Sequence, residues 1–546
     1  MSASKKLTIP EMLQVSFSKF SAKTALTFVG EEGMTYEQLK AEVETLGGSL
    51  RKMGVGEGTK VAILSANMPN WGISFFAVGA VGAVVVPILP DFSNNEIKNI
   101  LAHAEVEYVF ASESLVSKIN VDELPTIRII RIEDFQELKA DGTVAAIPDS
   151  TNQAFVYADV SEEDLLSIIY TSGTTGKSKG VLLTHKNICW NAQQSLTFQF
   201  INSEDRFLSM LPLSHTFENT LGLIFPIMYG ASVHYLRKAP TPSILLPALQ
   251  EVKPTIMLAV PLIIEKIFKG KVLPQINSNP VTRALFKVRP FQILLSRIAG
   301  KKLYETFGGK LKFFGIGGAK LDDQVERFLM DAKFPLAIGY GLTETSPLLA
   351  GAVGKNVRFL STGVPLKGVE LRIANADPKT GEGEVQARGN NVMKGYYKEP
   401  GLTADVFTED GWFRTGDLGK FDKGSLFIKG RIKNMILGAS GENIYPEEIE
   451  SVINRMEYVL ESLVVQQKGR LVAMVHLNMD EIEKRLQQAR DEAVLKFNTK
   501  VDDILAEIQK KVNDEVNKFS RIQMVVLQPV PFEKTPTMKI KRFLYL

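Results

Sequence analysis

The sequence predicts an α/β protein with two or more domains. Short apolar segments of strand length alternate with helical patterns over most of the chain, which is typical of βαβ units and parallel sheets. From Gly368 the expected strands become shorter and richer in glycine, which favours a more antiparallel part. The chain has 546 residues, of which 45% are apolar and 23% charged, so it can bury a large core and should divide into domains.

The first alternating segments lie between residues 60 and 111. We expect strands at 60–64, 83–88 and 108–111, and helices at 71–80 and 93–103. The longest apolar stretch, 73–89, contains two glycines and is interrupted by Pro87. It therefore predicts a buried helix followed by a strand rather than a membrane span.

The alternation continues downstream. The sequence predicts strands at 165–170, 232–236, 256–259 and 312–315, and helices at 242–252 and 322–328. In the glycine-rich part we expect strands at 369–373 and 383–388. After Arg431 a separate segment is expected, with a helix at 446–454, strands at 461–466 and 470–477, and a highly charged helical stretch at 480–519 that is mostly solvated.

Composition and charge exclude several classes of function. The formal net charge of +3 is too small to indicate a nucleic-acid partner, and we expect none. The single cysteine, Cys189, forms no intrachain disulfide and is expected to pack in the core. The five histidines are scattered and form no zinc-binding pattern. The N-terminus lacks the apolar core of a signal peptide, so we expect a cytoplasmic protein.

The loop after the strand at 165–170 has the composition of a phosphate-binding site. It reads Thr-Ser-Gly-Thr-Thr-Gly-Lys-Ser-Lys from Thr171 to Lys179. Glycines let backbone N–H groups approach phosphate oxygens, hydroxyls donate further hydrogen bonds, and a lysine neutralises charge. The loop is not a P-loop, because that motif would need a glycine at the position of Thr171. Taken alone, such a loop is also typical of a surface linker.

Four further segments carry chemistry that suits a nucleotide. Residues 339–345 (GYGLTET) offer an aromatic ring for a base and a carboxylate for magnesium, and 415–417 (TGD) offer a carboxylate for ribose hydroxyls. The third segment, 430–450, combines cations with a glycine-rich turn and a helix start, and the fourth, 534–541, is a basic loop almost at the C-terminus. Each alone also fits a turn, a strand end, a helix cap or a charged tail.

With this order and spacing, the chain resembles the adenylate-forming superfamily of acyl-CoA synthetases, peptide-synthetase adenylation domains and luciferases. The resemblance covers residues 8–546. Residues 211–218 (LPLSHTFE) and 535–539 (TPTMK) are similar to the L-P-L-x-H-x-x-E and T-P-T-x-K segments of long-chain fatty acyl-CoA synthetases. Met538 stands where other branches have glycine, which argues against the aryl and amino-acid branches. Ser178 replaces the usual proline and should slightly loosen the phosphate loop.

The resemblance implies roles in ATP binding. The β- and γ-phosphates would be bound by the loop residues Thr171, Ser172, Gly173, Thr174, Thr175, Gly176 and Lys179. Glu344, with Thr171, would hold Mg²⁺. Tyr340 would flank the adenine, Asp417 and Arg431 would hold the ribose, and the same cofactor site would include Gly318, Ala319, Gly341 and Thr343. His215 would lie near the acyl and ATP sites.

The resemblance also implies a two-step reaction. Lys539 would bridge the substrate carboxylate, the α-phosphate and the ribose while an acyl adenylate forms. A thiol would then attack the adenylate. Between the steps a small domain would rotate about Lys433 and bring Ser440 and Gly441 beside the pantetheine channel of CoA.

The implied architecture is a large N-terminal domain, 1–432, of αβαβα-layered sheets plus a β-rich subdomain, and a small mobile α+β C-terminal domain, 433–546. Residues 315–319 (GIGGA) would line an acyl tunnel, with a tight strand–helix turn as the other interpretation.

We therefore predict an AMP-forming long-chain fatty acid–CoA ligase that uses ATP, Mg²⁺ and CoA. The alternatives are a ligase that loads acyl carrier protein and a non-catalytic acyl- or nucleotide-binding homologue. The presence of Lys539, Glu344 and Asp417 argues against the second alternative. Peripheral association with a membrane, the choice between monomer and homodimer, and the preferred acyl length are left open by the sequence.

Overall fold

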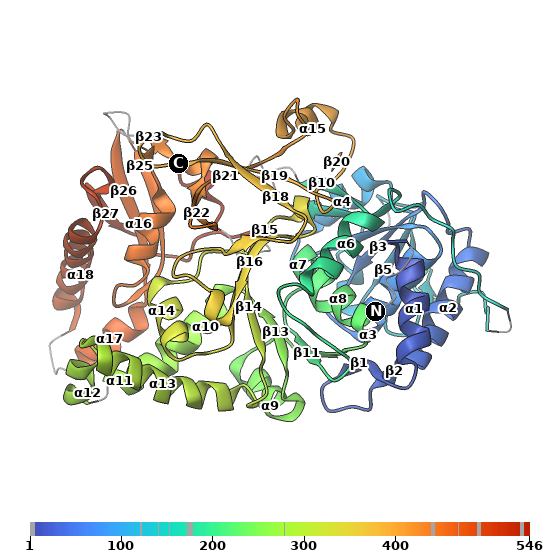
Figure 1. Cartoon of the computed structure of the whole chain (residues 1–546), viewed down its shortest axis with the longest axis horizontal. Helices are drawn as coiled ribbons and strands as arrows, with labels where there is room; N and C mark the ends of the chain where they lie inside the picture. Colours follow the sequence, from blue (N-terminus) through green and yellow to red (C-terminus); the bar gives the residue numbers. More distant parts are fainter. Residues whose placement is uncertain are drawn as a thin grey trace.

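Two nine-stranded sheets, with the helices that cover them, form most of the chain in the computed structural model (Figure 1). The structure describes residues 6–120, 123–139, 141–151, 153–171, 178–277, 279–437, 443–467, 469–488, 493–535 and 540–546. Within these residues the first sheet has the order β20-β10-β9-β4-β3-β5-β6-β7-β8. Its strands are β3 (Lys60–Leu64), β4 (Val84–Ile88), β5 (Tyr108–Ala111), β6 (Arg128–Arg131), β7 (Gln136–Leu138), β8 (Val144–Ala146), β9 (Leu165–Thr171), β10 (Lys179–Thr184) and β20 (Gly395–Tyr396).

The second sheet has the order β17-β16-β15-β14-β13-β11-β12-β1-β2. Its strands are β1 (Thr24–Phe28), β2 (Met34–Thr35), β11 (Arg206–Ser209), β12 (Ser232–Tyr235), β13 (Ile256–Ala259), β14 (Phe313–Ile316), β15 (Leu336–Gly341), β16 (Leu348–Val353) and β17 (Val364–Pro365). The strands from β1 to β15 in this order pair in parallel, as expected from the alternation of strands and helices.

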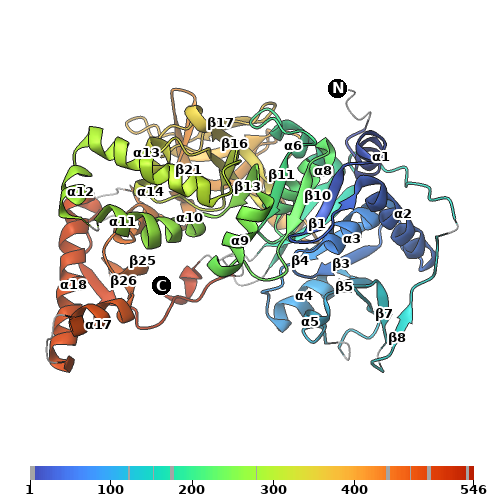
Figure 2. The ribbon, with the colours of Figure 1, turned by 90° about the horizontal axis from the view of Figure 1, so that it is seen from below.

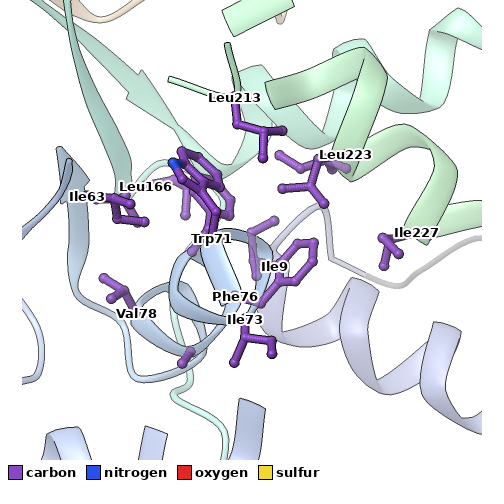
Figure 3. Close-up of a cluster of buried hydrophobic side chains, with 14 of the residues drawn as sticks. Ile9, Ile63, Trp71, Ile73, Phe76, Val78, Leu166, Leu213, Leu223 and Ile227 are labelled. Carbon is purple, nitrogen blue, oxygen red and sulfur yellow. The ribbon is translucent and has the colours of Figure 1, made fainter. Parts of the chain in front are cut away.

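Helices separate and cover the two sheets, which gives an αβαβα arrangement. The core between the sheets includes side chains of α1 (Ile9–Phe20), α3 (Pro69–Ala80), α6 (His185–Ser195) and α8 (Phe225–Tyr229). Figure 3 shows part of this core, where Trp71 and Phe76 of α3 lie among residues of both flanking layers. Almost every residue of α3 is buried, because this helix is apolar on all its faces.

The outer faces are covered by separate sets of helices. α4 (Asn94–Ala104) and α5 (Glu113–Val116) pack on the first sheet. α9 (Pro242–Val252), α10 (Pro261–Ile267), α13 (Arg289–Thr306) and α14 (Asp323–Asp331) pack on the second. Helix α13 approaches its neighbour closely at Gly300, where an added Cβ would stand 2.4 Å from Cβ of Ala332.

The predicted antiparallel part is a four-stranded sheet of order β18-β19-β21-β22. Its strands are β18 (Glu370–Ala374), β19 (Gly383–Arg388), β21 (Phe413–Asp422) and β22 (Ser425–Arg431). All three pairings are antiparallel. This sheet connects the layered part of the chain to the C-terminal segment.

The C-terminal segment has its own core at one end of the molecule (Figures 1 and 2). It contains β25 (Val459–Gln467), β26 (Arg470–Leu477) and β27 (Met524–Leu527), with α16 (Pro446–Ile453), α17 (Met479–Gln488) and α18 (Ala493–Glu515). The charged stretch predicted at 480–519 corresponds to α17 and α18, and α18 buries Ile504 and Ile508 in this core. Cys189 is buried in α6, as predicted. Within the described ranges, none of the helices has both the length and the apolar character to cross a membrane.

Candidate functional site

The predicted phosphate loop connects the two strands of an antiparallel hairpin. Strand β9 ends at Thr171 and β10 begins at Lys179, and these two residues are direct cross-strand partners. The residues expected to bind phosphate between them, Ser172, Gly173, Thr174, Thr175 and Gly176, lie outside the described residues. Because β9 runs parallel to β4, the loop leaves from the carboxyl end of a parallel strand, where α/β sheets usually bind ligands.

A tyrosine that sequence reasoning missed lies between two of the predicted site residues. Strand β10 pairs on its other side with β20, and this places Tyr396 beside the hairpin. Nζ of Lys179 lies 5.0 Å from the centroid of the Tyr396 ring, and the Tyr396 hydroxyl donates a hydrogen bond of 2.9 Å to Oε1 of Glu344. Burial and the neighbouring Glu344 charge raise the pKa of Tyr396, so its hydroxyl stays a donor.

Glu344 has the chemistry and the placement of a magnesium ligand. It lies in a short 3₁₀ helix, Thr343–Thr345, that directly follows β15, and its backbone carbonyl accepts from the N–H of Met393 at 2.8 Å. Among the described residues no group of three His, Cys, Asp or Glu could form a metal site. Mg²⁺ that accompanies a nucleotide needs only one or two carboxylates plus phosphate oxygens, so Glu344 and the hydroxyl of Thr171 fit such an ion.

A second group joins Tyr340, Asp417 and Arg431. The Tyr340 hydroxyl donates to Oδ2 of Asp417 at 2.7 Å, and Nε of Arg431 lies 2.8 Å from Oδ1 of the same carboxylate. Asp417 and Arg431 are cross-strand partners on β21 and β22. The residue Asp417 is only 4% exposed, and its N–H donates to Oγ1 of Thr415 at 3.1 Å. Burial and the Asp417 charge raise the pKa of Tyr340.

The two groups adjoin and form one polar site. The charges of Asp417 and Glu344 both act on the Arg431 guanidinium, and the Arg431 charge acts on Tyr396. The predicted residues Lys179, Tyr340, Glu344, Asp417 and Arg431 are therefore brought together from four different strands and a 3₁₀ turn. Two cations and two carboxylates with tyrosine donors suit a ligand that carries phosphates, hydroxyls and a bound cation.

The predicted glycine turns lie at one edge of the second sheet. Gly318 and Ala319 follow β14, and Gly341 ends β15, which is the parallel neighbour of β14. Thr343 begins the 3₁₀ turn after β15. A Cβ on Gly341 would stand 1.8 Å from the carbonyl oxygen of Pro347, so only glycine fits there. Gly318 has φ of +84°, a conformation that also favours glycine.

A narrow, almost wholly apolar pocket runs along the face of the second sheet below this edge. It is lined mainly by strands β11, β13, β14, β15 and β16, together with aromatic residues that include Phe198, Phe217 and Phe225. Gly339, at one end of the pocket, directly precedes Tyr340 of the polar site. The other end is formed by Phe207 and Phe313, both of which pair in register with Ile256.

Small residues widen this pocket. Gly315, Gly339 and Gly351 all line it. Of the segment expected in an acyl tunnel, Gly315 and Ile316 contribute to the wall, whereas residues 317–319 lie outside the lining. Residues 317–319 follow β14, which agrees with the other interpretation, a turn, and their place in an acyl tunnel stays a prediction.

His215 begins the short helix α7 (Thr216–Glu218), and its Nδ1 accepts from the N–H of Phe217 at 3.2 Å. This places the Phe217 ring in the pocket wall and against the turn after β14, since a Cβ on Gly317 would lie 3.2 Å from that ring. His215 is therefore connected to the apolar pocket through Phe217, which is one of the lining residues.

Glu218, in the same segment, is a buried carboxyl. Ser209 donates to its Oε1 at 2.6 Å, and Asn67 donates to Oγ of Ser209 at 2.9 Å. Oε2 of Glu218 has no partner among the described residues. Burial raises the pKa of Glu218 to about 8, so the carboxyl is mostly protonated near neutral pH.

The C-terminal predictions fall largely on residues outside the described ranges. Lys539 is one of them, although the ends of its loop are fixed by a bridge between Lys534 and Ile540 and by an ion pair between Lys534 and Glu461 of β25. Ser440 and Gly441 also lie outside the described residues, between the paired strands β23 (Ile436–Leu437) and β24 (Asn443–Ile444).

Lys433 is exposed in a 3₁₀ turn, Ile432–Asn434, that separates β22 from the C-terminal segment. The two parts touch on both sides of this turn. Lys429 lies 2.8 Å from Glu448, and the Tyr445 hydroxyl donates to Glu382 at 3.1 Å. The domain boundary at 433 and the hinge at Lys433 stay predictions.

Comparison with known proteins agrees with this geometry. Residues 13–397 match the family model of AMP-binding enzymes. The chain is 30% identical to long chain acyl-CoA synthetase 3 of Arabidopsis thaliana, over 93% of this chain and 84% of that protein. It is 27% identical to a chloroplastic long-chain-fatty-acid–[acyl-carrier-protein] ligase of the same plant, over 98% and 84%.

Solved structures share the fold. ATP-bound MatB from Rhodopseudomonas palustris has a TM-score of 0.77 at 23% identity and covers 98% of each chain. MenE from Bacillus subtilis in complex with ATP and magnesium ion has a TM-score of 0.75 at 21% identity and covers 97% of this chain and 98% of that one. The predicted fold class, a large layered α/β part with a small C-terminal domain, is confirmed.

Proposed function

We propose that this chain, which belongs to the family of AMP-binding enzymes, activates a long-chain fatty acid with ATP and transfers it to CoA. Adenylation of a carboxylic acid followed by transfer to a thiol is the chemistry typical of this family. What we propose beyond this family chemistry is that the substrate is a long-chain fatty acid.

One observation carries the proposal: the apolar pocket ends at Gly339, directly before Tyr340 of the polar site. An alkyl chain in this pocket would bury its methylenes among aromatic and aliphatic side chains, and each buried methylene contributes about 0.8 kcal/mol. Its carboxylate would then lie at the carboxyl edge of β14 and β15, beside Tyr340 and Asp417. A pocket with almost no polar lining gives no binding partner to a second charged group of a substrate.

The polar site would bind and orient the nucleotide. Asp417, oriented by Tyr340 and Arg431, carries a carboxylate that would accept hydrogen bonds from the ribose hydroxyls. Lys179, at the end of the phosphate hairpin, would neutralise phosphate charge. The reaction brings a carboxylate to the α-phosphorus of ATP, so positioning and neutralisation of charge are what the protein must supply.

Glu344 and Thr171 would hold Mg²⁺, and the bound ion would neutralise part of the negative charge on the phosphate oxygens. The Tyr396 hydrogen bond orients the Glu344 carboxylate for this task, since it occupies Oε1. We further propose that Lys539 bridges the acyl carboxylate and the α-phosphate during adenylation, and that the loop containing Ser440 and Gly441 serves the transfer to CoA.

The test is pyrophosphate release measured over a panel of carboxylic acids, with and without CoA, and with the thioester product identified by mass. We expect the highest rates with chains of roughly 12–18 carbons, because longer chains bury more methylenes. A best substrate that is aromatic, or shorter than about six carbons, would contradict the long-chain assignment. Release of no pyrophosphate with any acid would support a non-catalytic homologue instead.

Acyl carrier protein is the second candidate acceptor, because one similar protein is named as a ligase for that carrier. The same assay decides between the two acceptors when acyl carrier protein replaces CoA. Faster thioester formation on the carrier protein at equal concentration would replace CoA in the proposal.

A further inference from the structure

A row of large apolar side chains is exposed on helix α13. Phe291, Leu294 and Ile298 are 44%, 54% and 53% exposed. Their spacing of three and four residues places them on one side of the helix. Ser296, Gly300 and Leu303, which pack inward, lie on the opposite side. The exposed row is therefore an outward ridge, and helix α13 itself lies near the bottom edge of the molecule in Figure 1.

Positive charge surrounds this ridge. Residues 266–304 contain nine lysines and arginines and no aspartate or glutamate, whereas the whole chain has a net charge of only +3. All nine are exposed: Lys266, Lys269, Lys271, Arg283, Lys287, Arg289, Arg297, Lys301 and Lys302. On α13 itself, Lys301 and Lys302 lie on the two flanks of the ridge, since they follow Ile298 by three and four residues. Glu305 ends the ridge at the C-terminal end of the helix.

Few of these cations form an ion pair or a hydrogen bond with another described residue of the chain. Arg289 pairs with Asp331 of α14, and Nζ of Lys269 donates to the carbonyl of Asn454. Within the described residues, no ion pair joins Lys287, Lys301 or Lys302 to an acidic side chain. Single exposed apolar residues are common on protein surfaces, but a continuous apolar ridge flanked by unpaired cations is not.

We propose that α13, with the preceding helix α12 (Pro280–Leu285), docks on the surface of a lipid bilayer that carries anionic headgroups. A helix with one apolar face and basic flanks lies in the interface of such a bilayer, with its apolar side chains among the acyl chains and its cations at the phosphates. Val281 and Val288, 63% and 49% exposed, add to the apolar surface of this segment. The inference is independent of the reaction proposed above.

The shape of the surface favours a bilayer over a protein partner. The apolar groups form an exposed row on one side of α13, and the cations lie on its flanks and along a further stretch of chain. An acidic protein would need a groove that fits this row, whereas a bilayer admits it without any matching shape. An acidic protein, and a second copy of this chain, are separate outcomes of the test.

The test is flotation of the full chain with vesicles of phosphatidylcholine alone and with vesicles that contain one quarter phosphatidylglycerol. We expect binding to the anionic vesicles only, and loss of binding in high salt, because about 1 M salt screens charges beyond roughly 3 Å. The triple variant Phe291→Ser/Leu294→Ser/Ile298→Ser and the double variant Lys301→Glu/Lys302→Glu should each reduce the bound fraction about tenfold or more.

Matched controls make the same changes at exposed positions elsewhere. Val156→Ser/Phe200→Ser removes apolar surface, and Lys379→Glu/Lys423→Glu reverses two charges. Neither should change binding, and all four variants should keep the wild-type thermal midpoint. Equal binding by the α13 variants and the wild type, or no binding of the wild type to either vesicle, would overturn the proposal. If the α13 variants instead abolish self-association or capture of acyl carrier protein without any vesicle binding, the surface is a protein interface and the lipid assignment is wrong.

Discussion

The Tyr340 hydroxyl donates a 2.7 Å hydrogen bond to Asp417 and thereby connects the end of β15 to the antiparallel sheet. The other oxygen of Asp417 is bound by Arg431, which lies directly across from it on β22. The carboxylate is thus held from two sides before any ligand binds. Such prior orientation lowers the entropy that a ligand must lose on binding.

Tyr340→Phe should weaken ATP binding about tenfold, because a hydrogen bond to a charged group contributes about 1.5 kcal/mol. The ring remains, so its packing against the nucleotide should be kept. Titration calorimetry with ATP measures the effect. Tyr235→Phe is the matched control, since the Tyr235 hydroxyl is buried without a hydrogen-bond partner among the described residues. Equal ATP affinity in Tyr340→Phe and the wild type would show that Asp417 is oriented without Tyr340.

Part of the order of strands and helices could be predicted from the sequence. The bounds of β3, β5, β13 and β26 agree with the predicted ones to the residue, because each is a short and mostly apolar run. The motif segments were also sufficient to name Lys179, Glu344 and Asp417. Their assembly into one site was implied by resemblance and not by the pattern of any single segment.

Tyr396 could not be predicted. It lies in β20, a strand of two residues with no periodicity of its own, and it reaches Glu344 only because β20 pairs with β10. The residues that close the far end of the apolar pocket could not be predicted either, for a similar reason. Phe207 and Phe313 belong to strands far apart in sequence that pair with the two sides of β13. Long-range pairing of this kind leaves no local pattern in one sequence.

Phe313 limits the length of the apolar pocket in a way that can be tested. Its ring lies where a side chain on Gly315 would stand, since a Cβ there would be 2.5 Å from Cε1 of Phe313. Phe313→Ala should lengthen the best fatty acid by roughly two to four carbons, each added methylene contributing about 0.8 kcal/mol. Gly315→Val should shorten it. The measurement is kcat/KM for acids of increasing length.

The control for these pocket variants is Gly401→Ala, an exposed glycine with nothing within 4 Å of an added Cβ. It should leave the profile of acyl length unchanged. If Phe313→Ala and Gly315→Val also leave the profile unchanged, the acyl chain does not occupy this pocket.

Lys539→Ala should lower the rate of adenylate formation by a factor on the order of a hundred or more, if Lys539 neutralises charge in that step. Thioester formation from supplied acyl adenylate should remain nearly normal. Both rates are measured by single turnover. The control is Lys541→Ala, which removes a cation that is paired with Glu533 in the same segment. An equal loss of both half-reactions in Lys539→Ala would contradict the role.

Glu218 should make stability depend on pH. Its pKa is about 8 in the folded chain, against an ordinary value near 4.5, because the carboxyl is buried. Between these values the folded chain binds a proton that the unfolded chain has released, so raising the pH through this window lowers the free energy of unfolding by about 1.4 kcal/mol per unit. The contribution is full below the unfolded pKa and is lost as the pH passes the folded one.

Glu218→Gln removes this titration and keeps an oxygen that can accept from Ser209. The thermal midpoint of the wild type should therefore fall, relative to that of this variant, by about 1–2 °C per pH unit between pH 5 and 8. Glu326, whose pKa is raised to about 7 by burial, is present in both proteins, so its effect cancels in the difference. A difference that stays constant over this range would show that the Glu218 carboxyl does not remain protonated in the folded chain.

Lys433→Pro tests whether the small domain must rotate. Lys433 lies in the first turn of the 3₁₀ helix at Ile432–Asn434, where a backbone N–H has no partner within the helix, and proline is tolerated at such positions. Proline fixes φ near −65°, so it should hold the connection in one conformation. We expect adenylate formation within about tenfold of normal and a severe loss of thioester formation, because the domain would not reach its second orientation.

Single-turnover assays of each half-reaction measure the two effects separately. Lys433→Ala is the matched control, because it removes the same exposed charge and leaves φ and ψ free. It should leave both rates near normal if backbone rotation is what matters. If the connector is rigid and Lys433 is only an exposed charge, the proline variant will slow both half-reactions alike or neither. In that outcome the small domain keeps one orientation, and that orientation must serve both steps. Two contacts across the connector would then be permanent, namely the Lys429–Glu448 ion pair and the Tyr445–Glu382 hydrogen bond.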